Sequence, residues 1–328
     1  MTLGLVIGKF YPPHRGHKHL IDTAKAQCDR LIVVLPHHPS QQIPGELRRD
    51  WLREIHPDCE IHLVPDELEN DSKSWADWVI AYLGRSPDVV FTSEDYGSEF
   101  AKHMNCRHVM VDRARQIIPI SGTMIRDNPL EYLAYLEPCV RAYFIPRVVL
   151  IGAESTGKTT LAQHLAKTFQ TNWVAEYGRE YWEQKAINWQ NQTPTWTSDE
   201  FVHIAAEQQR RENLAARTAN KILFCDTNAF ATCTWHERYV GHRNEAVDAI
   251  GRRDVADLYL LLDIDVPFTQ DGWRDGENIR SWMHQRFAEQ LSRQSTPTKI
   301  LNGDWAQRTQ GAEKSVAEFL TQFSRLPK

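Results

Sequence analysis

The sequence predicts an α/β protein with two domains, each built around a parallel β-sheet. Its 328 residues exceed what a single compact domain usually holds. Short apolar segments alternate with amphipathic ones along most of the chain, as in sheets that are covered by helices on both faces. The alternation is interrupted once, between Glu137 and Pro146, where we expect a connector. We therefore place the domains at residues 1–145 and 146–328.

Each half contains its own series of strands and helices. Nearly continuous apolar runs predict strands at residues 3–7, 31–36, 60–64, 89–92 and 108–111, and apolar side chains at helical spacing predict helices at 18–27, 46–55 and 74–83. In the second half we expect strands at 148–151, 173–175, 222–225, 258–262 and 299–301, with helices at 158–168, 199–218 and 310–323.

Composition excludes several classes of protein. The net charge of −5 comes from 38 basic and 43 acidic residues with no basic block, so we expect no nucleic-acid partner. No apolar run approaches the ~20 residues that span a bilayer, so we expect no membrane partner. Six scattered cysteines without a CxxC pair argue against a disulfide framework or a zinc site. The N-terminus lacks a signal-peptide pattern, which favours a cytoplasmic protein. The sequence leaves open whether the chain forms a homo-oligomer.

The clearest motif opens the second half. Gly152-Ala-Glu-Ser-Thr-Gly-Lys-Thr159 fits GxxxxGK[ST] between a predicted strand and a predicted helix, which predicts a P-loop that binds ATP. Backbone N–H groups would surround the phosphates, Lys158 would neutralise the β and γ oxygens, and the Thr159 hydroxyl would ligate Mg²⁺. The expected ATP contacts in this motif are Gly152, Glu154, Ser155, Thr156, Gly157, Thr159 and Thr160.

Further polar residues suggest phosphoryl transfer to a hydroxyl. Asp226 ends a predicted strand, where P-loop proteins place a carboxylate near Mg²⁺, although it could also cap the next helix. The loop Asp271–Arg280 would be a lid with Arg274 at the triphosphate, or simply a solvated charged loop. Glu176 follows the second strand and could accept the hydroxyl proton, or merely start a helix.

Substrate contacts of this half are the least motif-like. We expect Tyr177, Arg179 and Gln208 to contact the substrate, with Gln208 and nearby tryptophans framing a planar base. Each tryptophan taken alone fits core or surface packing better than it fits a ligand contact.

The first half opens with Gly8-Lys-Phe-Tyr-Pro-Pro-His14-Arg-Gly-His17, in which a strand gives way to a proline-rich loop and a helix. The motif resembles the HxGH signature of the adenylyltransferase superfamily. The resemblance implies that His14 and His17 stabilise the α-phosphate of ATP, with Gly8, Lys9 and Phe10 in the same loop. A second element, Ile120-Ser121-Gly-Thr123-Met-Ile-Arg126, is similar to the family's pyrophosphate-binding segment, in which Arg126 would reach the leaving phosphates.

The two motifs in this order resemble the bifunctional nicotinamide-mononucleotide adenylyltransferase/ribosylnicotinamide kinase family. The resemblance implies a Rossmann-like nucleotidyltransferase domain followed by a P-loop kinase domain. The kinase would convert nicotinamide riboside to nicotinamide mononucleotide with ATP, and the transferase would join that product to AMP, giving NAD and pyrophosphate. The implied cofactor is Mg²⁺, and the implied partners are these small molecules and ATP.

The same resemblance implies further residues of the nucleotide site, and the chain differs from some members of the family in one respect. Ser93–Gly97 matches a stretch that lines it, and Trp75 or Trp78 would stack on the cationic nicotinamide ring, although both also fit a core-facing helix stripe. Some members carry an N-terminal helix-turn-helix domain; here the first strand begins at Leu3, so we expect no direct DNA binding.

Two other functions remain open at this point. A coenzyme A synthase type of enzyme, phosphopantetheine adenylyltransferase followed by dephospho-coenzyme A kinase, would share both motifs. We rank it second because Ser121–Arg126 and the Glu176–Arg179 and Asp226–Asn228 segments fit the pyridine-nucleotide family better. A non-catalytic nucleotide sensor would not need Lys158, Thr159, Asp226, His14 and His17 together.

Overall fold

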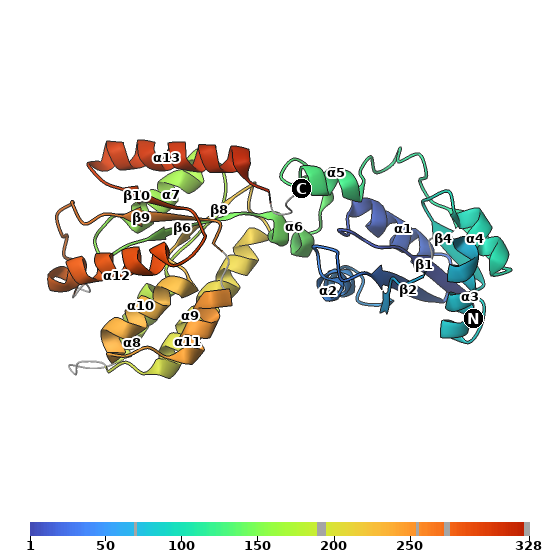
Figure 1. Cartoon of the computed structure of the whole chain (residues 1–328), viewed down its shortest axis with the longest axis horizontal. Helices are drawn as coiled ribbons and strands as arrows, with labels where there is room; N and C mark the ends of the chain where they lie inside the picture. Colours follow the sequence, from blue (N-terminus) through green and yellow to red (C-terminus); the bar gives the residue numbers. More distant parts are fainter. Residues whose placement is uncertain (69–70, 189–194, 254–255, 272–275, 325–328) are drawn as a thin grey trace. The chain divides into compact units, whose positions relative to one another are not determined.

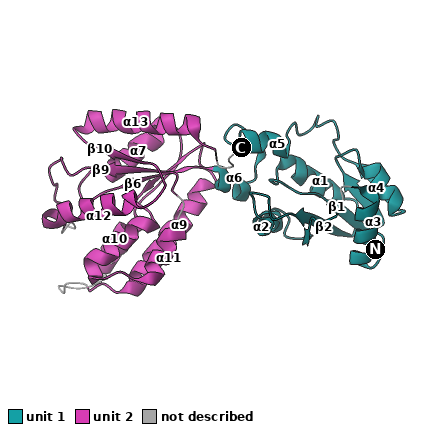
Figure 2. Cartoon of the chain, in the orientation of Figure 1, with its two compact units in different colours: residues 1–144, 326–328 teal, residues 145–325 magenta. Residues whose placement is uncertain are grey.

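The computed structural model describes residues 1–68, 71–188, 195–253, 256–271 and 276–324. The chain divides into two compact units, the first comprising residues 1–144 and the second beginning at Ile145 (Figure 2). Each unit contains one five-stranded sheet in which every strand pair is parallel. The prediction of an α/β fold with two parallel sheets is therefore confirmed.

The first unit has the strand order β3-β2-β1-β4-β5. Its strands are β1 (Leu3–Ile7), β2 (Arg30–His37), β3 (Glu60–Pro65), β4 (Val89–Thr92) and β5 (Arg107–Met110). Its helices are α1 (Arg15–Lys25), α2 (Gly45–Ile55), α3 (Ser72–Leu83), α4 (Gly97–His103), α5 (Gly122–Asp127) and α6 (Pro138–Phe144), with a 3₁₀ turn η1 (Leu133–Tyr135).

The sheet of the first unit is buried on both faces. Val6 and Val33 pack with Leu20 and Ile21 of α1, whereas their neighbours Leu5 and Ile32 point to the opposite face, toward α3 and α4. Because successive side chains of a strand alternate between faces, a strand covered on both sides is apolar at nearly every position. This explains why these strands are recognisable in the sequence as short continuous apolar runs.

The second unit has the strand order β10-β9-β6-β8-β7. Its strands are β6 (Arg147–Ile151), β7 (Trp173–Val174), β8 (Leu223–Asp226), β9 (Leu258–Leu262) and β10 (Thr298–Leu301). Its helices are α7 (Lys158–Thr168), α8 (Tyr177–Asn188), α9 (Ser198–Ala216), α10 (Ala229–Val240), α11 (Glu245–Arg253), α12 (Arg280–Ser292) and α13 (Trp305–Gln322), with a 3₁₀ turn η2 (Glu277–Ile279).

Helices α7 and α13 lie on one side of the second sheet, and α9, α10 and α12 lie on the other (Figure 1). The α7 and α13 side includes Leu161, Leu165 and Val316 packed on β6, β8 and β9. The long helices begin at polar caps: Thr197 and Glu200 form a reciprocal capping box at α9, and Asp304 and Gln307 form one at α13. Such caps satisfy N–H groups that a helix start leaves without partners.

The predicted strands agree with the structure to within one or two residues, and the segment 137–146, predicted as a connector, spans the division between the two units after Phe144. Most of it is helix α6, which buries Cys139, Val140 and Phe144. Pro138 occupies the first helical position, where its missing N–H costs nothing, so a proline that suggested a break marks a helix start. Among the described residues, no helix is both long enough and apolar enough to cross a membrane.

Candidate active sites

In each unit a phosphate-binding motif follows a central strand. β1 lies between β2 and β4, and β6 lies between β9 and β8. In open parallel sheets, ligands bind beyond the carboxyl ends of the strands where neighbouring connections diverge. The two motifs begin at those ends, Gly8 after β1 and Gly152 after β6.

The two signature histidines of the first unit are in direct contact. His14 caps α1, and its Nδ1 accepts a hydrogen bond from the His17 backbone N–H at 3.3 Å. The two rings stack with centroids 3.7 Å apart, and Phe10 packs edge-on against His17 at 5.0 Å. A Cβ at Gly16 would lie 3.0 Å from the His14 ring, so glycine there permits the stacked arrangement.

Both histidines are held neutral near pH 7. Burial, with a smaller contribution from the charge of Arg115, lowers the pKa of His14 to about 4. Burial, with His14 and Arg115, also lowers the pKa of His17 well below its usual value. His17 Nδ1 is buried without a hydrogen-bond partner among the described residues. Near neutral pH the pair therefore presents ring N–H dipoles to the cavity rather than two cations.

The second element of the first unit joins the first through Arg126. The guanidinium donates to the Tyr11 carbonyl oxygen at 2.5 Å and to Thr123 Oγ1 at 3.0 Å, and it lies 4.7 Å from the centre of the Tyr11 ring. Ser121 caps α5 by accepting a hydrogen bond from the Met124 N–H at 3.2 Å. A Cβ at Gly122 would lie 2.6 Å from the Tyr11 carbonyl oxygen, so the helix start and the loop are in close contact.

A cavity of about 570 Å³ opens between these elements. It brings together most of the residues predicted for this half: Gly8, Lys9, Phe10, His14, His17, Trp75, Ser121, Thr123 and Arg126. Ser93, Glu94 and Tyr96 also line it. Trp75 is therefore placed where a ring could stack on it, whereas Trp78 packs with Trp75 and Tyr82 in the aromatic stripe of α3.

Two arginines of the first unit were missed by sequence reasoning. Arg115 lines the cavity from the segment that follows β5. Arg48 is fully buried on α2 and donates hydrogen bonds to the Lys9 carbonyl oxygen and, at 2.6 Å, to Gln41 Oε1. The position of Arg115 beyond the carboxyl end of a strand was the signal available in the sequence. Arg48 sits in an ordinary amphipathic helix and has no such signal.

The P-loop of the second unit has the backbone that its glycines allow. Gly152 has φ 153° and Gly157 has φ 90°, and a Cβ at Gly152 would lie 2.9 Å from the Leu262 carbonyl oxygen. Ser155 also adopts a left-handed φ of 59°. Lys158 Nζ donates to the Ala153 carbonyl oxygen at 3.0 Å, which closes the loop on itself. Thr160 is exposed in the first turn of α7.

Asp226 at the end of β8 meets Thr159 at the start of α7. The Thr159 hydroxyl donates a hydrogen bond to Asp226 Oδ2, and Asp226 Oδ1 is buried without a partner in the described part of the chain. Burial raises the pKa of Asp226, against the opposing effect of Lys158. A buried carboxylate oxygen without a donor, next to a hydroxyl, is a set of hard oxygen ligands that fits Mg²⁺. Within the described residues no group of three His, Cys, Asp or Glu side chains is arranged to hold a metal.

A smaller cavity of about 90 Å³ lies beside the P-loop. Trp182 and Trp196 line it and stack at 5.5 Å, and Glu154, Glu176, Arg179 and Gln208 also contribute. The Glu176 side chain keeps some exposure, but the protein around it excludes most water. This burial raises the pKa of Glu176 to about 7, with Lys158 lowering it and Asp226 raising it. An aromatic-walled cavity with a carboxyl of this pKa suits a planar substrate with a reacting hydroxyl.

Of the three residues predicted to contact the substrate of this half, two line the small cavity and one does not. Gln208 lines the cavity, but its amide already accepts from the Tyr177 N–H and donates to Glu212, both at 2.9 Å. Tyr177 is not among the lining residues, and its hydroxyl lies 3.0 Å from His203 Nε2. Arg179 lines the cavity while paired with Glu183 and Asp271.

The segment after β9 rests on the P-loop. Glu154 accepts hydrogen bonds from Arg238 at 2.8 Å and from the Gly276 N–H at 2.9 Å, and Ser155 Oγ accepts one from the Thr269 N–H at 2.7 Å. The predicted lid therefore contacts the loop that it was expected to cover. Arg274, the predicted lid arginine, lies outside the described residues.

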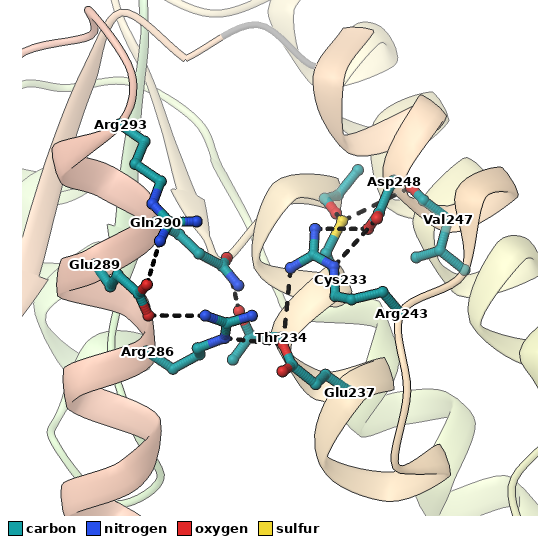
Figure 3. A network of polar contacts seen from close by, with 11 residues as sticks. Cys233, Thr234, Glu237, Arg243, Val247, Asp248, Arg286, Glu289, Gln290 and Arg293 are labelled. Atoms are coloured by element: carbon teal, nitrogen blue, oxygen red, sulfur yellow. Dashed lines mark hydrogen bonds and ion pairs between the residues drawn. The ribbon is translucent and has the colours of Figure 1, made fainter.

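Helix α10, which carries Arg238, is fixed by a polar network shown in Figure 3. Glu237 pairs with Arg286 of α12 at 2.9 Å and with Arg243, just before α11, at 3.7 Å. Thr234 donates to Gln290 of α12 at 2.9 Å. The network ties α10 to α12 and to the segment before α11, and α10 contributes Trp235 and Tyr239 to the wall of the small cavity.

Together the two units define a protein with one nucleotide-phosphate site in each of two α/β units, an HxGH-type site and a P-loop site. Residues 5–128 match the cytidylyltransferase-like family and residues 147–308 match the AAA domain family.

Curated relatives give the particular family. The trifunctional NAD biosynthesis/regulator protein NadR of Escherichia coli (strain K12) is 31% identical over 83% of this chain and 72% of its own length. The NadR protein of Salmonella typhimurium is 30% identical over the same shares. The chain belongs to the NadR family.

Solved structures agree on the fold. A NadR protein in complex with NR superposes with a TM-score of 0.78 at 22% identity, covering 98% of this chain and 97% of that one. A NadR protein in complex with NAD and AMP-PNP gives a TM-score of 0.75 at 21% identity, covering 100% of this chain and 98% of that one.

Proposed function

We propose that the chain carries out two consecutive steps of NAD synthesis. The second unit transfers the γ-phosphoryl group of ATP to nicotinamide riboside, and the first unit transfers the adenylyl group of another ATP to the resulting nicotinamide mononucleotide. Membership of a family whose curated members are named for NAD biosynthesis supports this pair of reactions. The observation that carries the transferase assignment is the hydrogen bond from Arg126 to the Tyr11 carbonyl, because it unites the two adenylyltransferase motifs in one cavity.

In the transferase step, the 5′-phosphate of nicotinamide mononucleotide attacks the α-phosphorus of ATP. The bond between the α-phosphorus and the bridging oxygen to the β-phosphate breaks, and pyrophosphate leaves with that electron pair. In this proposal, His14 and His17 donate hydrogen bonds to the α-phosphate as its charge increases. Arg126 binds the leaving phosphates. The attacking phosphate is already ionised near pH 7, so orientation and charge stabilisation suffice without a protein base.

In the kinase step, the riboside hydroxyl attacks the γ-phosphorus of ATP and loses its proton. The bond between the γ-phosphorus and the oxygen that bridges to the β-phosphate breaks, and ADP leaves with that electron pair. Glu176, with its pKa near 7, would orient the hydroxyl and accept that proton. Lys158 would leave the Ala153 carbonyl to contact the β and γ oxygens. Thr159 and Asp226 would hold Mg²⁺, which when bound neutralises charge on the β and γ phosphates. We further propose a cytoplasmic location, since no disulfide joins the six cysteines, all of which lie in the described residues.

One experiment tests the proposal against its alternatives. The protein is incubated with Mg·ATP and, in separate reactions, with nicotinamide riboside, nicotinamide mononucleotide, phosphopantetheine and dephospho-coenzyme A, and products are identified by mass. Nicotinamide mononucleotide and NAD are expected from the first two reactions. Formation of dephospho-coenzyme A or coenzyme A would instead favour the coenzyme A synthase type, and absence of all turnover would favour a sensor.

A further inference from the structure

The transferase cavity has fewer available cations than its proposed ligand requires. A nucleoside triphosphate brings several negative charges close together, and the enzyme must offset them as pyrophosphate departs. The lysine and arginine side chains among the lining residues of the cavity are Lys9, Arg115 and Arg126. His14 and His17 supply dipoles rather than full charges, because burial keeps both neutral.

Two of these three cations already have closer or more numerous partners. Lys9 is 58% exposed, but its Nζ lies 2.7 Å from Oδ2 of Asp66, which is only 13% exposed. Arg126 donates to the Tyr11 carbonyl oxygen and to Thr123 Oγ1. Arg115 is different: it pairs with Glu94 at 3.2 Å through a single guanidinium nitrogen, and the two side chains are 47% and 56% exposed. A solvated pair of this kind is weak and readily exchanged.

The backbone that carries Arg115 is preformed. Arg115 has a left-handed φ of 51°, and its N–H donates to the Asp112 carbonyl oxygen at 2.8 Å. The Asp112 carboxylate accepts hydrogen bonds from the N–H groups of Gln116 at 2.8 Å and Ile118 at 3.0 Å. Such a closed turn fixes the position of the Arg115 Cα while leaving its long side chain free to change partner. Arg115 lines the same cavity as both signature histidines, which are proposed to bind the α-phosphate.

We propose that Arg115 is a catalytic residue of the adenylyl transfer site, whose guanidinium leaves Glu94 and binds the triphosphate of ATP. The exchange replaces a single solvated contact with charge-assisted hydrogen bonds to phosphate, for which the planar guanidinium is well matched. Glu94, which also lines the cavity, holds the arginine ready before ATP binds. This inference rests on the proposed transferase function of the first unit.

The test compares Arg115→Gln with Arg113→Gln. Arg113 belongs to the same segment, pairs with Asp95, is 63% exposed and is not a lining residue of the cavity. In steady-state assays of NAD formation from nicotinamide mononucleotide, Arg115→Gln should lower kcat/KM for ATP on the order of 10²-fold, through both a lower kcat and a higher KM. Arg113→Gln should match the parent. Both variants should keep phosphorylation of nicotinamide riboside, which reports on folding of the second unit only.

Two further variants separate phosphate binding from support of the loop. Glu94→Gln weakens the pair that ATP must replace and should therefore lower KM for ATP. Arg115→Lys keeps the charge and should recover part of the activity that Arg115→Gln loses, which also guards against a fold defect. The inference is overturned if Arg115→Gln matches the parent, or if Glu94→Gln reproduces the full loss. A parent protein that makes no NAD would instead reject the proposed function itself.

Discussion

The Thr159 hydroxyl donates a hydrogen bond to Asp226 Oδ2, although the two residues are 67 positions apart in the chain. They meet because β6, which leads into the P-loop, pairs in parallel with β8, which ends at Asp226. Parallel pairing brings the carboxyl ends of both strands to one edge of the sheet. The contact assembles the hydroxyl and carboxylate that we propose for Mg²⁺ before any ligand is bound.

Substitution of Asp226 should affect the kinase reaction alone. Asp226→Asn removes the charged oxygen donor, so phosphorylation of nicotinamide riboside should fall on the order of 10²-fold, and its dependence on Mg²⁺ should shift to higher concentrations. A magnesium titration of the riboside assay measures the shift. NAD formation from the mononucleotide serves as the internal control. An unchanged titration would rule out Asp226 as a metal-associated residue.

Lys158→Ala should abolish riboside phosphorylation and spare NAD formation from the mononucleotide. The lysine amine is the cation proposed to contact the β and γ phosphates, and its substitution leaves the first unit untouched. Product analysis of both half-reactions on one preparation measures the outcome. Loss of both activities in a folded variant would contradict independent sites.

His17→Ala should have the opposite effect. Removal of one transition-state hydrogen-bond donor should lower NAD formation on the order of 10²-fold or more while riboside phosphorylation continues. Assays of riboside phosphorylation and of NAD formation on one preparation measure both effects. Melting curves check that the first unit stays folded without the ring that stacks on His14. A variant that still forms NAD at the parental rate would show that His17 has no part in the transfer.

The sequence predicted motifs better than it predicted the contacts around them. Gly8–His17 and Ser121–Arg126 were recognisable because adenylyl transfer restricts residue type and spacing, and the structure brings both to one cavity. Arg48 was missed because burial of an arginine depends on distant backbone acceptors such as the Lys9 carbonyl. Arg238 was missed for the same reason, since its partner Glu154 belongs to another part of the chain.

Secondary structure, too, was predicted well in some parts of the chain and poorly in others. Strands were predicted closely because burial on both faces makes them continuously apolar. Helix starts after Glu176 and Asp226 were considered, but the bounds of α8 and α10 were not predicted. These helices pack against other helices, and their apolar side chains form no simple stripe. Gln208 was predicted to contact substrate, but both ends of its amide bind protein groups, which no spacing in the sequence could indicate.

The rate of riboside phosphorylation should increase with pH around neutrality. The pKa of Glu176 is raised to about 7 by burial, so its base form becomes the major form only above that pH. Since the folded pKa exceeds the ordinary value of 4.5, the contribution of this group to stability decreases as the pH rises from 4.5 to about 7. Glu176→Gln should abolish this increase in the pH–rate profile of riboside phosphorylation, together with most of the activity.

A matched control for that substitution is Glu180→Gln, in the first turn of α8, which begins directly after Glu176. Glu180 is a solvated carboxyl whose pKa is lowered by Arg211, so it is ionised across the whole range. Its substitution should leave the shape of the pH–rate profile unchanged. If Glu176→Gln retained the parental increase with pH, another group would have to be the base.

Gly122→Ala should disable the transferase cavity by moving its second motif. A Cβ at this position would lie 2.6 Å from the Tyr11 carbonyl oxygen, a backbone atom that also accepts the hydrogen bond from Arg126. Alanine is a better helix former than glycine by up to ~1 kcal/mol, which by itself would raise the free energy of unfolding of the variant. Overpacking against backbone costs ~1–3 kcal/mol, and the clash should therefore prevail. Either the loop or α5 must shift, and in both cases Arg126 loses its position.

The unfolding temperature and the rate of NAD formation should both fall in Gly122→Ala. Met124→Ala, at an exposed position of the same helix, should change neither. A Gly122→Ala protein with raised stability and full NAD formation would mean that α5 and the Tyr11 loop do not pack as closely as this contact requires.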